Sequence, residues 1–165
     1  MNESMTRESN IVTDEKEVGL LYQELLKGWN KRRACEMTDL FTEDGNLVGF
    51  DGSQINGRSE ARSVLSQIFA DHQTAAYMGI VKEVRLLSPD VAILRAVAGM
   101  VPPGQSDINP EVNAVQTLVS VKQQNKWSIA LFQNTPAAFH GRPELSERLT
   151  EELRQALRTS SNEIN

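Results

Sequence analysis

Few side chains in this sequence have both a chemistry and a position that suggest a reaction or a binding site. The alternating stretch Lys126–Pro136 ends in two amides, Gln133 and Asn134, and the only histidines are His72 and His140. A buried amide must find partners, because leaving it unpaired costs about 1–3 kcal/mol, so Asn134 either hydrogen-bonds loop backbone or orients a ligand in an apolar cavity. A histidine can serve as a base near neutral pH, so His72 is the candidate catalytic residue.

Composition and motifs argue against several other kinds of site. Two separate histidines and one cysteine, Cys35, provide no zinc ligand set, so we expect no metal. We also expect no cofactor, because the sequence has no Gly-x-Gly-x-x-Gly motif. The net charge is −5 and no basic cluster is larger than residues 31–33, which argues against a nucleic-acid partner.

The chain also lacks the segments that would direct it to a membrane or across one. No stretch reaches about 18 consecutive apolar residues, the length that a transmembrane helix requires. Residues 1–10 have no apolar core of the kind found in signal peptides. We therefore expect a cytoplasmic protein with no membrane partner.

Helices are indicated where apolar residues recur three and four positions apart. Thr13 or Asp14 is the expected N-cap of a first helix, which ends near Asn30 and carries the strongest apolar stripe. A short second helix is predicted over 34–41, a third over 58–72, and a last one from Pro143, with a leucine every four residues. Residues 1–12 are polar and aperiodic, so we expect a disordered tail there.

From Ala75 onward the apolar period changes to two, which indicates strands. Four are predicted, over 76–87, 91–101, 112–123 and 126–135, and a shorter one, over 46–50, precedes the third helix. Short connections favour antiparallel pairing in chain order. The fold class is therefore α+β, with helices packed on one face of a curved antiparallel sheet. Residues 13–136 form one domain, and 137–165 form a C-terminal helical extension.

The turns between strands give a strand register, and the register assigns side chains to the two faces of the sheet. Counting back from the turns places Glu83 opposite Arg95, and Thr117 opposite Phe132. The resulting inner face is almost wholly apolar, and it either packs as an ordinary core or surrounds a cavity. The predicted ligand-binding residues are Tyr22, Trp29, Phe50, Met78, Met100, Thr117, Phe132 and Asn134.

The other face of the sheet mixes aliphatic residues with paired polar groups. It is too apolar for open solvent and too polar for a core, which is typical of a subunit interface. We therefore expect a homodimer. The residues predicted to form its interface are Arg95, Gln116, Leu118, Ile129, Leu131 and Gln133.

Several short motifs, taken in order, carry a resemblance to a known family. They are Trp29-Asn30, the run Leu40–Gly45, Gly57-Arg58, and Trp127 followed by Phe132–Pro136. With this order of elements, the chain over Glu15–Pro136 resembles the cone-shaped nuclear transport factor 2-like fold. Within that fold it is most similar to the SnoaL-like group of the SgcJ/EcaC type, and the HGRPEL run after the last strand is similar too.

The resemblance implies a homodimer with one pocket inside each cone. Relatives that catalyse reactions, such as ketosteroid isomerases and SnoaL-type cyclases, use a carboxylate inside the cone as acid or base. A carboxylate is suited to this because an apolar cavity raises its pKa toward neutrality. The predicted inner face of this chain has no Asp or Glu, which departs from that pattern.

The leading functional hypothesis is therefore binding of a small, largely apolar molecule, such as a polyketide-like or aromatic metabolite. One alternative is a cofactor-free enzyme of polyketide type, with His72 as base and Asn134 stabilising an enolate-like oxygen. Another is a dimeric interaction module whose cone is filled by its own side chains.

Overall fold

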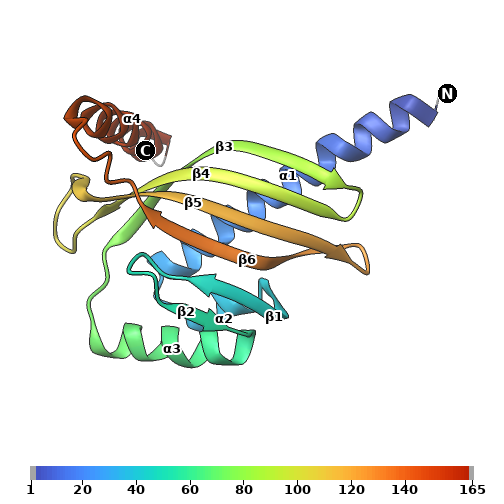
Figure 1. The fold of residues 1–165 in the computed structure, drawn as a ribbon, viewed down its shortest axis with the longest axis horizontal. Coiled ribbons are helices and arrows are strands. Elements are labelled where there is room, and N and C mark those ends of the chain that lie inside the picture. The colour runs from blue at the N-terminus through green and yellow to red at the C-terminus, as the bar shows by residue number, and fades with distance from the viewer. Residues whose placement is uncertain (1–2, 164–165) are drawn as a thin grey trace.

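The computed structural model describes residues 3–163, which form an α+β fold with a curved mixed sheet (Figure 1). The strand order is β2-β1-β6-β5-β4-β3; β1 is parallel to β6, and the other neighbours are antiparallel. This confirms the predicted fold class. The elements, in chain order, are α1 (Glu3–Asn30), α2 (Ala34–Thr38), β1 (Phe41–Val48), β2 (Gln54–Asn56), α3 (Arg58–Asp71), β3 (Ala76–Ser88), β4 (Val91–Val101), β5 (Asn109–Gln123), β6 (Lys126–Pro136) and α4 (Pro143–Glu163).

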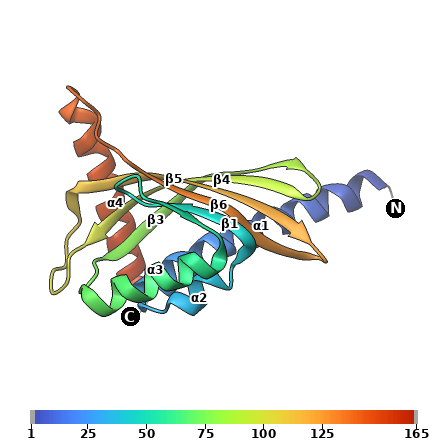
Figure 2. The same cartoon turned by 60° about the horizontal axis from the view of Figure 1, so that its bottom comes forward.

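Helices α1, α2 and α3 lie on one side of the sheet (Figure 2). The predicted apolar stripe of α1 is buried there, with Val18 and Tyr22 at 0% exposure and Leu25 at 1%. Helix α3 packs on β1 and β2, and its buried side chains are Ala61, Leu65 and Phe69. The main core therefore fills the space between these helices and the inner face of the sheet.

Helix α1 begins ten residues before the expected N-cap. Residues 3–12, predicted to be a disordered tail, are its first turns and extend beyond the sheet (Figure 1), while residues 1–2 lie outside the described range. Asp14 is not a cap: it is buried within the helix, where its carboxylate accepts hydrogen bonds from Trp127 Nε1 (3.0 Å) and Lys122 Nζ (3.1 Å). These bonds hold α1 to the last residues of β5 and the first residues of β6.

The segment after α2 also differs from the prediction. The second helix ends at Thr38 rather than residue 41, and β1 begins at Phe41 rather than residue 46. Strand β1 continues through Asp44-Gly45 because it pairs in parallel with β6, through an irregular register between Phe41 and Asn46. Strand β2 was not predicted; it forms a hairpin with β1, in which Gly52 has a φ of 89°.

A β-bulge in β6 overturns part of the predicted register. The β3–β4 pairing is as predicted near the turn, with Glu83 opposite Arg95, but Lys82 is left without a partner and the pairing before it is shifted by one residue. Between β5 and β6, however, Thr117 lies opposite Gln133, not Phe132, because Ala130 is left without a partner between Ile129 and Leu131. One extra residue exchanges the faces of all positions beyond it.

The bulge decides which side chains enter the core. Three residues predicted for the outer face are fully buried on the inner one, and they are Gln116, Leu118 and Ile129. Conversely, Thr117 lies on the outer face, opposite Gln133. Arg95, Leu131 and Gln133 remain on the outer face, as predicted.

The faces of β3 and β4 can be identified from two glycines. A Cβ atom on Gly79 would lie 2.5 Å from Leu26 Cδ1 of α1, whereas a Cβ atom on Gly99 would lie 2.9 Å from Leu153 Cδ1 of α4. Met78 pairs with Gly99 and so faces α4. Its predicted place inside the cone is therefore wrong, because the irregularity at Lys82 exchanges the faces of the β3 residues before it and puts Met78 on the opposite side from Gly79.

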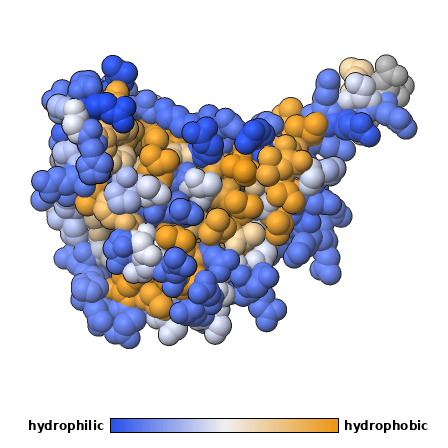
Figure 3. Space-filling view, in the orientation of Figure 1, coloured by the Kyte–Doolittle hydropathy of each residue, from blue (hydrophilic) through white to orange (hydrophobic). Residues whose placement is uncertain are grey.

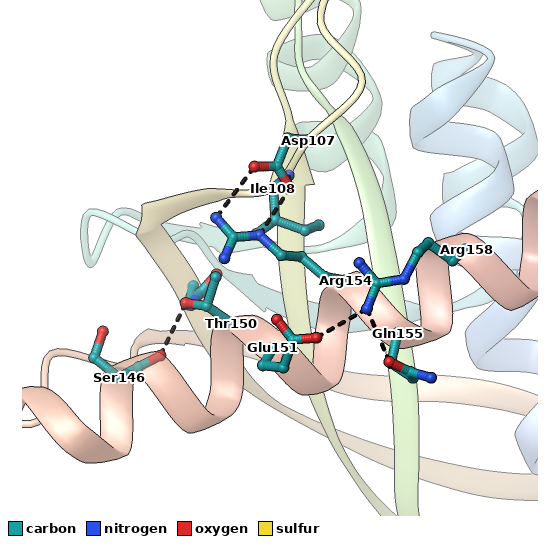
Figure 4. Close-up of polar contacts among 9 residues, drawn as sticks. Asp107, Ile108, Ser146, Thr150, Glu151, Arg154, Gln155 and Arg158 are labelled. Carbon is teal, nitrogen blue, oxygen red and sulfur yellow. Dashed lines mark hydrogen bonds and ion pairs between the residues drawn. The ribbon is translucent and has the colours of Figure 1, made fainter.

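Helix α4 covers the outer face at the end of the sheet nearest the β4–β5 loop. Ile108, Leu149 and Leu153 form a second buried cluster there. Figure 4 shows the polar contacts: Arg154 donates to both carboxylate oxygens of Asp107 (2.9 and 3.1 Å), and Thr150 donates to the carbonyl of Ser146 (2.8 Å). The hydrogen bond from Arg154 is the main cause of a lowered pKa for Asp107.

None of the helices in the described part of the chain combines the length and apolar character needed to span a membrane.

Candidate functional site

A cavity of about 600 Å³ lies between the helices and the inner face of the sheet. Two other hollows, of about 910 and 900 Å³, lie on the surface and are lined mainly by charged and polar side chains. The inner cavity is lined mostly by apolar side chains: Leu25, Leu26, Trp29, Met37, Leu47, Val48, Gly49, Phe50, Asp51, Ser53, Gln54, Ile55, Glu60, Val64, Leu65, Ile68, Tyr77, Met100, Val112, Phe132 and Asn134. Its size and walls are typical of a small-molecule site.

One wall of the cavity is fixed by the end of α1. Trp29 donates from Nε1 to the carbonyl of Ala75 (2.8 Å), and its ring lies edge-on to Phe69 and tilted against Tyr77. The next residue, Asn30, accepts from the Tyr77 backbone N–H (2.7 Å) and donates to the Tyr77 carbonyl (3.0 Å). Since β3 is an edge strand, this amide replaces a missing neighbouring strand and holds Tyr77 in place.

A chain of four polar side chains runs from the core to the cavity. The Tyr22 hydroxyl donates to Gln116 Oε1 (2.6 Å), and Gln116 Nε2 donates to Asn134 Oδ1 (3.3 Å). Asn134 Nδ2 in turn donates to the hydroxyl oxygen of Tyr77 (3.0 Å). The bulge in β6 makes this possible, because it places Gln116 directly opposite Asn134 on the inner face.

The ionisable groups of the site separate into buried hydroxyls and exposed carboxylates. Burial raises the pKa of Tyr22 and of Tyr77, so both hydroxyls stay protonated at neutral pH. Among the described lining residues the only carboxylates are Asp51 and Glu60, both exposed. The hydrogen bonds from Ser53 lower the pKa of Asp51, and Glu60 accepts from the Asn56 backbone N–H (2.9 Å).

The structure brings together five of the eight predicted ligand-binding residues. Trp29, Phe50, Met100, Phe132 and Asn134 line the cavity. The other three do not: Tyr22 contacts it only through Gln116 and Asn134, Met78 faces α4, and Thr117 lies on the outer face.

His72, the candidate catalytic residue, is exposed at the C-terminal end of α3 and does not line the cavity. Its backbone carbonyl accepts a hydrogen bond from Arg32 (2.7 Å). His140 is exposed in the turn before α4. In the part of the chain that the structure describes, no group of three or more His, Cys, Asp or Glu side chains is placed to hold a metal ion.

Two residues of the hydrogen-bond chain at the candidate site, Tyr77 and Gln116, were not placed there from the sequence. Tyr77 is the second residue of β3 and lies on the same face of that strand as Gly79, two positions along. A glycine there is a signal of close packing against α1, and it would have placed both residues on the inner face. Gln116 was assigned to the outer face because the bulge has no local marker: Ala130 is tolerated on either face.

Comparison with solved structures identifies the fold. The chain superposes on a domain of unknown function with a cystatin-like fold from Nostoc punctiforme, with a TM-score of 0.73, 20% identity and coverage of 92% of this chain and 94% of that one. An NTF-2 like protein of unknown function from Shewanella oneidensis gives a TM-score of 0.61 at 19% identity, over 74% of this chain and 98% of that one. The fold is NTF2-like.

A third structure with the NTF2-like fold is a ketosteroid isomerase-like protein from Erwinia carotovora. Its TM-score is 0.60 at 18% identity, and the match covers 74% of this chain and 95% of that one. Identities this low show the NTF2-like fold alone. No protein-family description matches the sequence, and no curated protein matches it either.

Proposed function

We propose that this protein binds a small, largely apolar molecule, such as a polyketide-like or aromatic metabolite, in the cavity of its cone. The observation that carries the proposal is a cavity of about 600 Å³ with mostly apolar walls, in which Asn134 and Tyr77 are hydrogen-bonded to each other and the remaining polar lining residues, Asp51, Ser53, Gln54 and Glu60, are exposed. Apolar walls contribute affinity through buried area, and a few fixed polar groups orient the ligand. The resemblance to the SnoaL-like group of the SgcJ/EcaC type supports the same kind of ligand.

Filling the cavity should abolish binding. Val64 lines the cavity from α3 and is half-buried, so Val64→Trp places an indole ring in the ligand space. With the hydrocarbon diphenylmethane as probe, we expect Kd to rise at least about tenfold, equivalent to roughly 1.4 kcal/mol. Equilibrium dialysis of purified protein measures the bound fraction.

Ser66→Trp is the matched control, because Ser66 is exposed on the same helix and does not line the cavity. It should bind diphenylmethane as the natural sequence does. If Val64→Trp binds equally well, the probe is not in the cone. If the natural sequence binds no probe at all, the interaction module with a filled cone replaces the binding proposal.

We also propose that the protein forms a homodimer through the outer face of the sheet. This face lies opposite α1–α3, and Figure 3 shows apolar side chains gathered across it. A second copy placed there would bury these side chains and leave the cavity free. The partly or fully exposed residues of this face are Ile93, Arg95, Val115, Thr117, Val119, Val121, Leu131 and Gln133.

A charge in this face should separate the subunits. Val119→Lys introduces a lysine on β5, opposite Leu131, where an apolar contact with the second copy is expected. Light scattering during size-exclusion chromatography should give twice the 18.4 kDa chain mass for the natural sequence and the single chain mass for the variant. Leu20→Lys, an exposed position of α1, should leave the dimer intact. A natural protein that elutes as a monomer at micromolar concentration contradicts the proposal.

A further inference from the structure

In the hydrogen-bond chain from Tyr22 to Tyr77, every bond is donated in the same direction, from the buried end toward the cavity. Each side-chain amide offers one accepting oxygen and one donating nitrogen, so the orientation of one amide sets that of the next. The sequence of donors is Tyr22, then Gln116, then Asn134. Tyr77 therefore ends the chain as an acceptor.

The buried end determines this direction. Tyr22 has 0% exposure, and its hydroxyl lies beside Leu26 and the backbone of Gly79, with Gln116 Oε1 as its acceptor among residues 3–163. In the reversed chain, Gln116 would donate to Tyr22, and the Tyr22 hydrogen would point into apolar surroundings. A buried hydroxyl without an acceptor loses a hydrogen bond that water would otherwise supply, so the reversed chain is disfavoured.

At the cavity end, the hydrogen of the Tyr77 hydroxyl has no acceptor among residues 3–163. The hydroxyl oxygen of Tyr77 accepts from Asn134 Nδ2, so its own hydrogen is directed elsewhere, and this side chain lines the cavity. Burial raises the pKa of Tyr77, so that hydrogen is present at neutral pH. Four other lining side chains, Asp51, Ser53, Gln54 and Glu60, carry oxygens, but they are exposed and none of them accepts a hydrogen bond from the Tyr77 hydroxyl.

We propose that the cavity selects apolar ligands that carry a hydrogen-bond acceptor, such as a ketone or quinone oxygen placed against the Tyr77 hydroxyl. Tyr22, which does not line the cavity, acts as a positioning residue that sets this preference through Gln116 and Asn134. This inference rests on the proposed function and narrows its ligand class.

The test compares two probes of similar shape, benzophenone and diphenylmethane, which differ by a carbonyl oxygen. The natural sequence should bind benzophenone about tenfold more tightly, the gain expected for one hydrogen bond to an otherwise unpaired donor. Tyr77→Phe should remove this preference, because the donor is gone. Calorimetry or equilibrium dialysis gives both affinities.

Tyr22→Phe is the decisive variant. Without the Tyr22 hydroxyl, the two amides can reverse, and Tyr77 can then donate to Asn134 Oδ1 instead of the ligand. The benzophenone preference should fall several-fold, while diphenylmethane affinity changes by less than about twofold. Gln116→Met interrupts the same chain one residue further along and should have the same effect, so the test does not depend on one variant folding well.

The carbonyl stretching frequency of bound benzophenone provides a readout that a general structural defect would not move. It should be lowered in the natural protein by the hydrogen bond from Tyr77, unshifted in Tyr77→Phe, and intermediate in Tyr22→Phe. Equal binding of the two probes by the natural protein overturns the inference but leaves the proposed function standing. If the preference for benzophenone survives both Tyr22→Phe and Gln116→Met, the role of Tyr22 is overturned. If the natural protein binds neither benzophenone nor diphenylmethane, the proposed function itself is overturned.

Discussion

Gly79→Ala should lower the free energy of unfolding by about 3 kcal/mol, the upper part of the range for overpacking a core. The added Cβ atom would lie 2.5 Å from Leu26 Cδ1 and closer still to the Tyr22 hydroxyl, so α1 would have to move away from β3. Urea denaturation followed by circular dichroism measures the change. The same displacement should disturb the first bond of the Tyr22–Tyr77 chain.

Gly19→Ala is the matched control for this prediction. Among residues 3–163, apart from the chain neighbours of Gly19 and the backbone of α1 itself, no atom lies within 4 Å of a Cβ at Gly19, so alanine should stabilise the protein by about 0.5–1 kcal/mol through helix propensity. In a Tyr22→Phe background the cost of Gly79→Ala should shrink, because the nearest atom has been removed. A cost below about 1 kcal/mol in the natural background would show that α1 and β3 are less closely packed than the structure has them.

Leu153→Ala should also cost about 3 kcal/mol, a typical value for truncating a fully buried leucine. Leu153 has 0% exposure and lies at the centre of the small cluster that holds α4 to the outer face. Without the leucine side chain, the Arg154–Asp107 ion pair is too exposed to hold the helix alone. Chemical denaturation gives the free energy, and limited proteolysis at residues 137–142 reports release of α4.

The control for this second prediction is Glu147→Ala, an exposed position on the same helix. It should leave both stability and the digestion pattern unchanged, within about 0.5 kcal/mol. If Leu153→Ala digests as the natural sequence does and loses less than about 1 kcal/mol, the α4 cluster does not contribute to the stability of the domain.

Much of the fold could be predicted because its signals are local. The apolar stripes of α1 and α3 and the alternation of β3 to β6 predicted elements whose bounds agree closely with the structure, apart from the start of α1. The stretch Lys126–Pro136 was predicted to be a strand with an amide, Asn134, facing the cavity, and Asn134 does line the cavity. These features follow from the arrangement of side chains within each element, which the sequence contains directly.

What could not be predicted depends on interactions between distant parts of the chain. The parallel pairing of β1 with β6 turns Asp44-Gly45 from a chain break into part of a strand, and no local pattern encodes it. The burial of Asp14 depends on Trp127 and Lys122, more than a hundred residues away. The conformation of β1 and the burial of Asp14 each depend on a residue or strand that is distant in the sequence. That partner comes into contact only when the whole domain has folded.

The sequence by itself determined the fold class, the order of the elements apart from β2, and four apolar residues of the cavity wall, Trp29, Phe50, Met100 and Phe132, because these follow from hydrophobic periodicity. Asn134 was also predicted, but only the tertiary structure showed that Tyr77 lines the cavity and that Gln116 lies beside Asn134. One bulge at Ala130 moves Gln116 into the core beside Asn134, and that single shift links Tyr22 to Tyr77. The physical reason is that alternation has a period of two, so one extra residue exchanges the faces, and an alanine that fits either face gives no sign of where the exchange occurs.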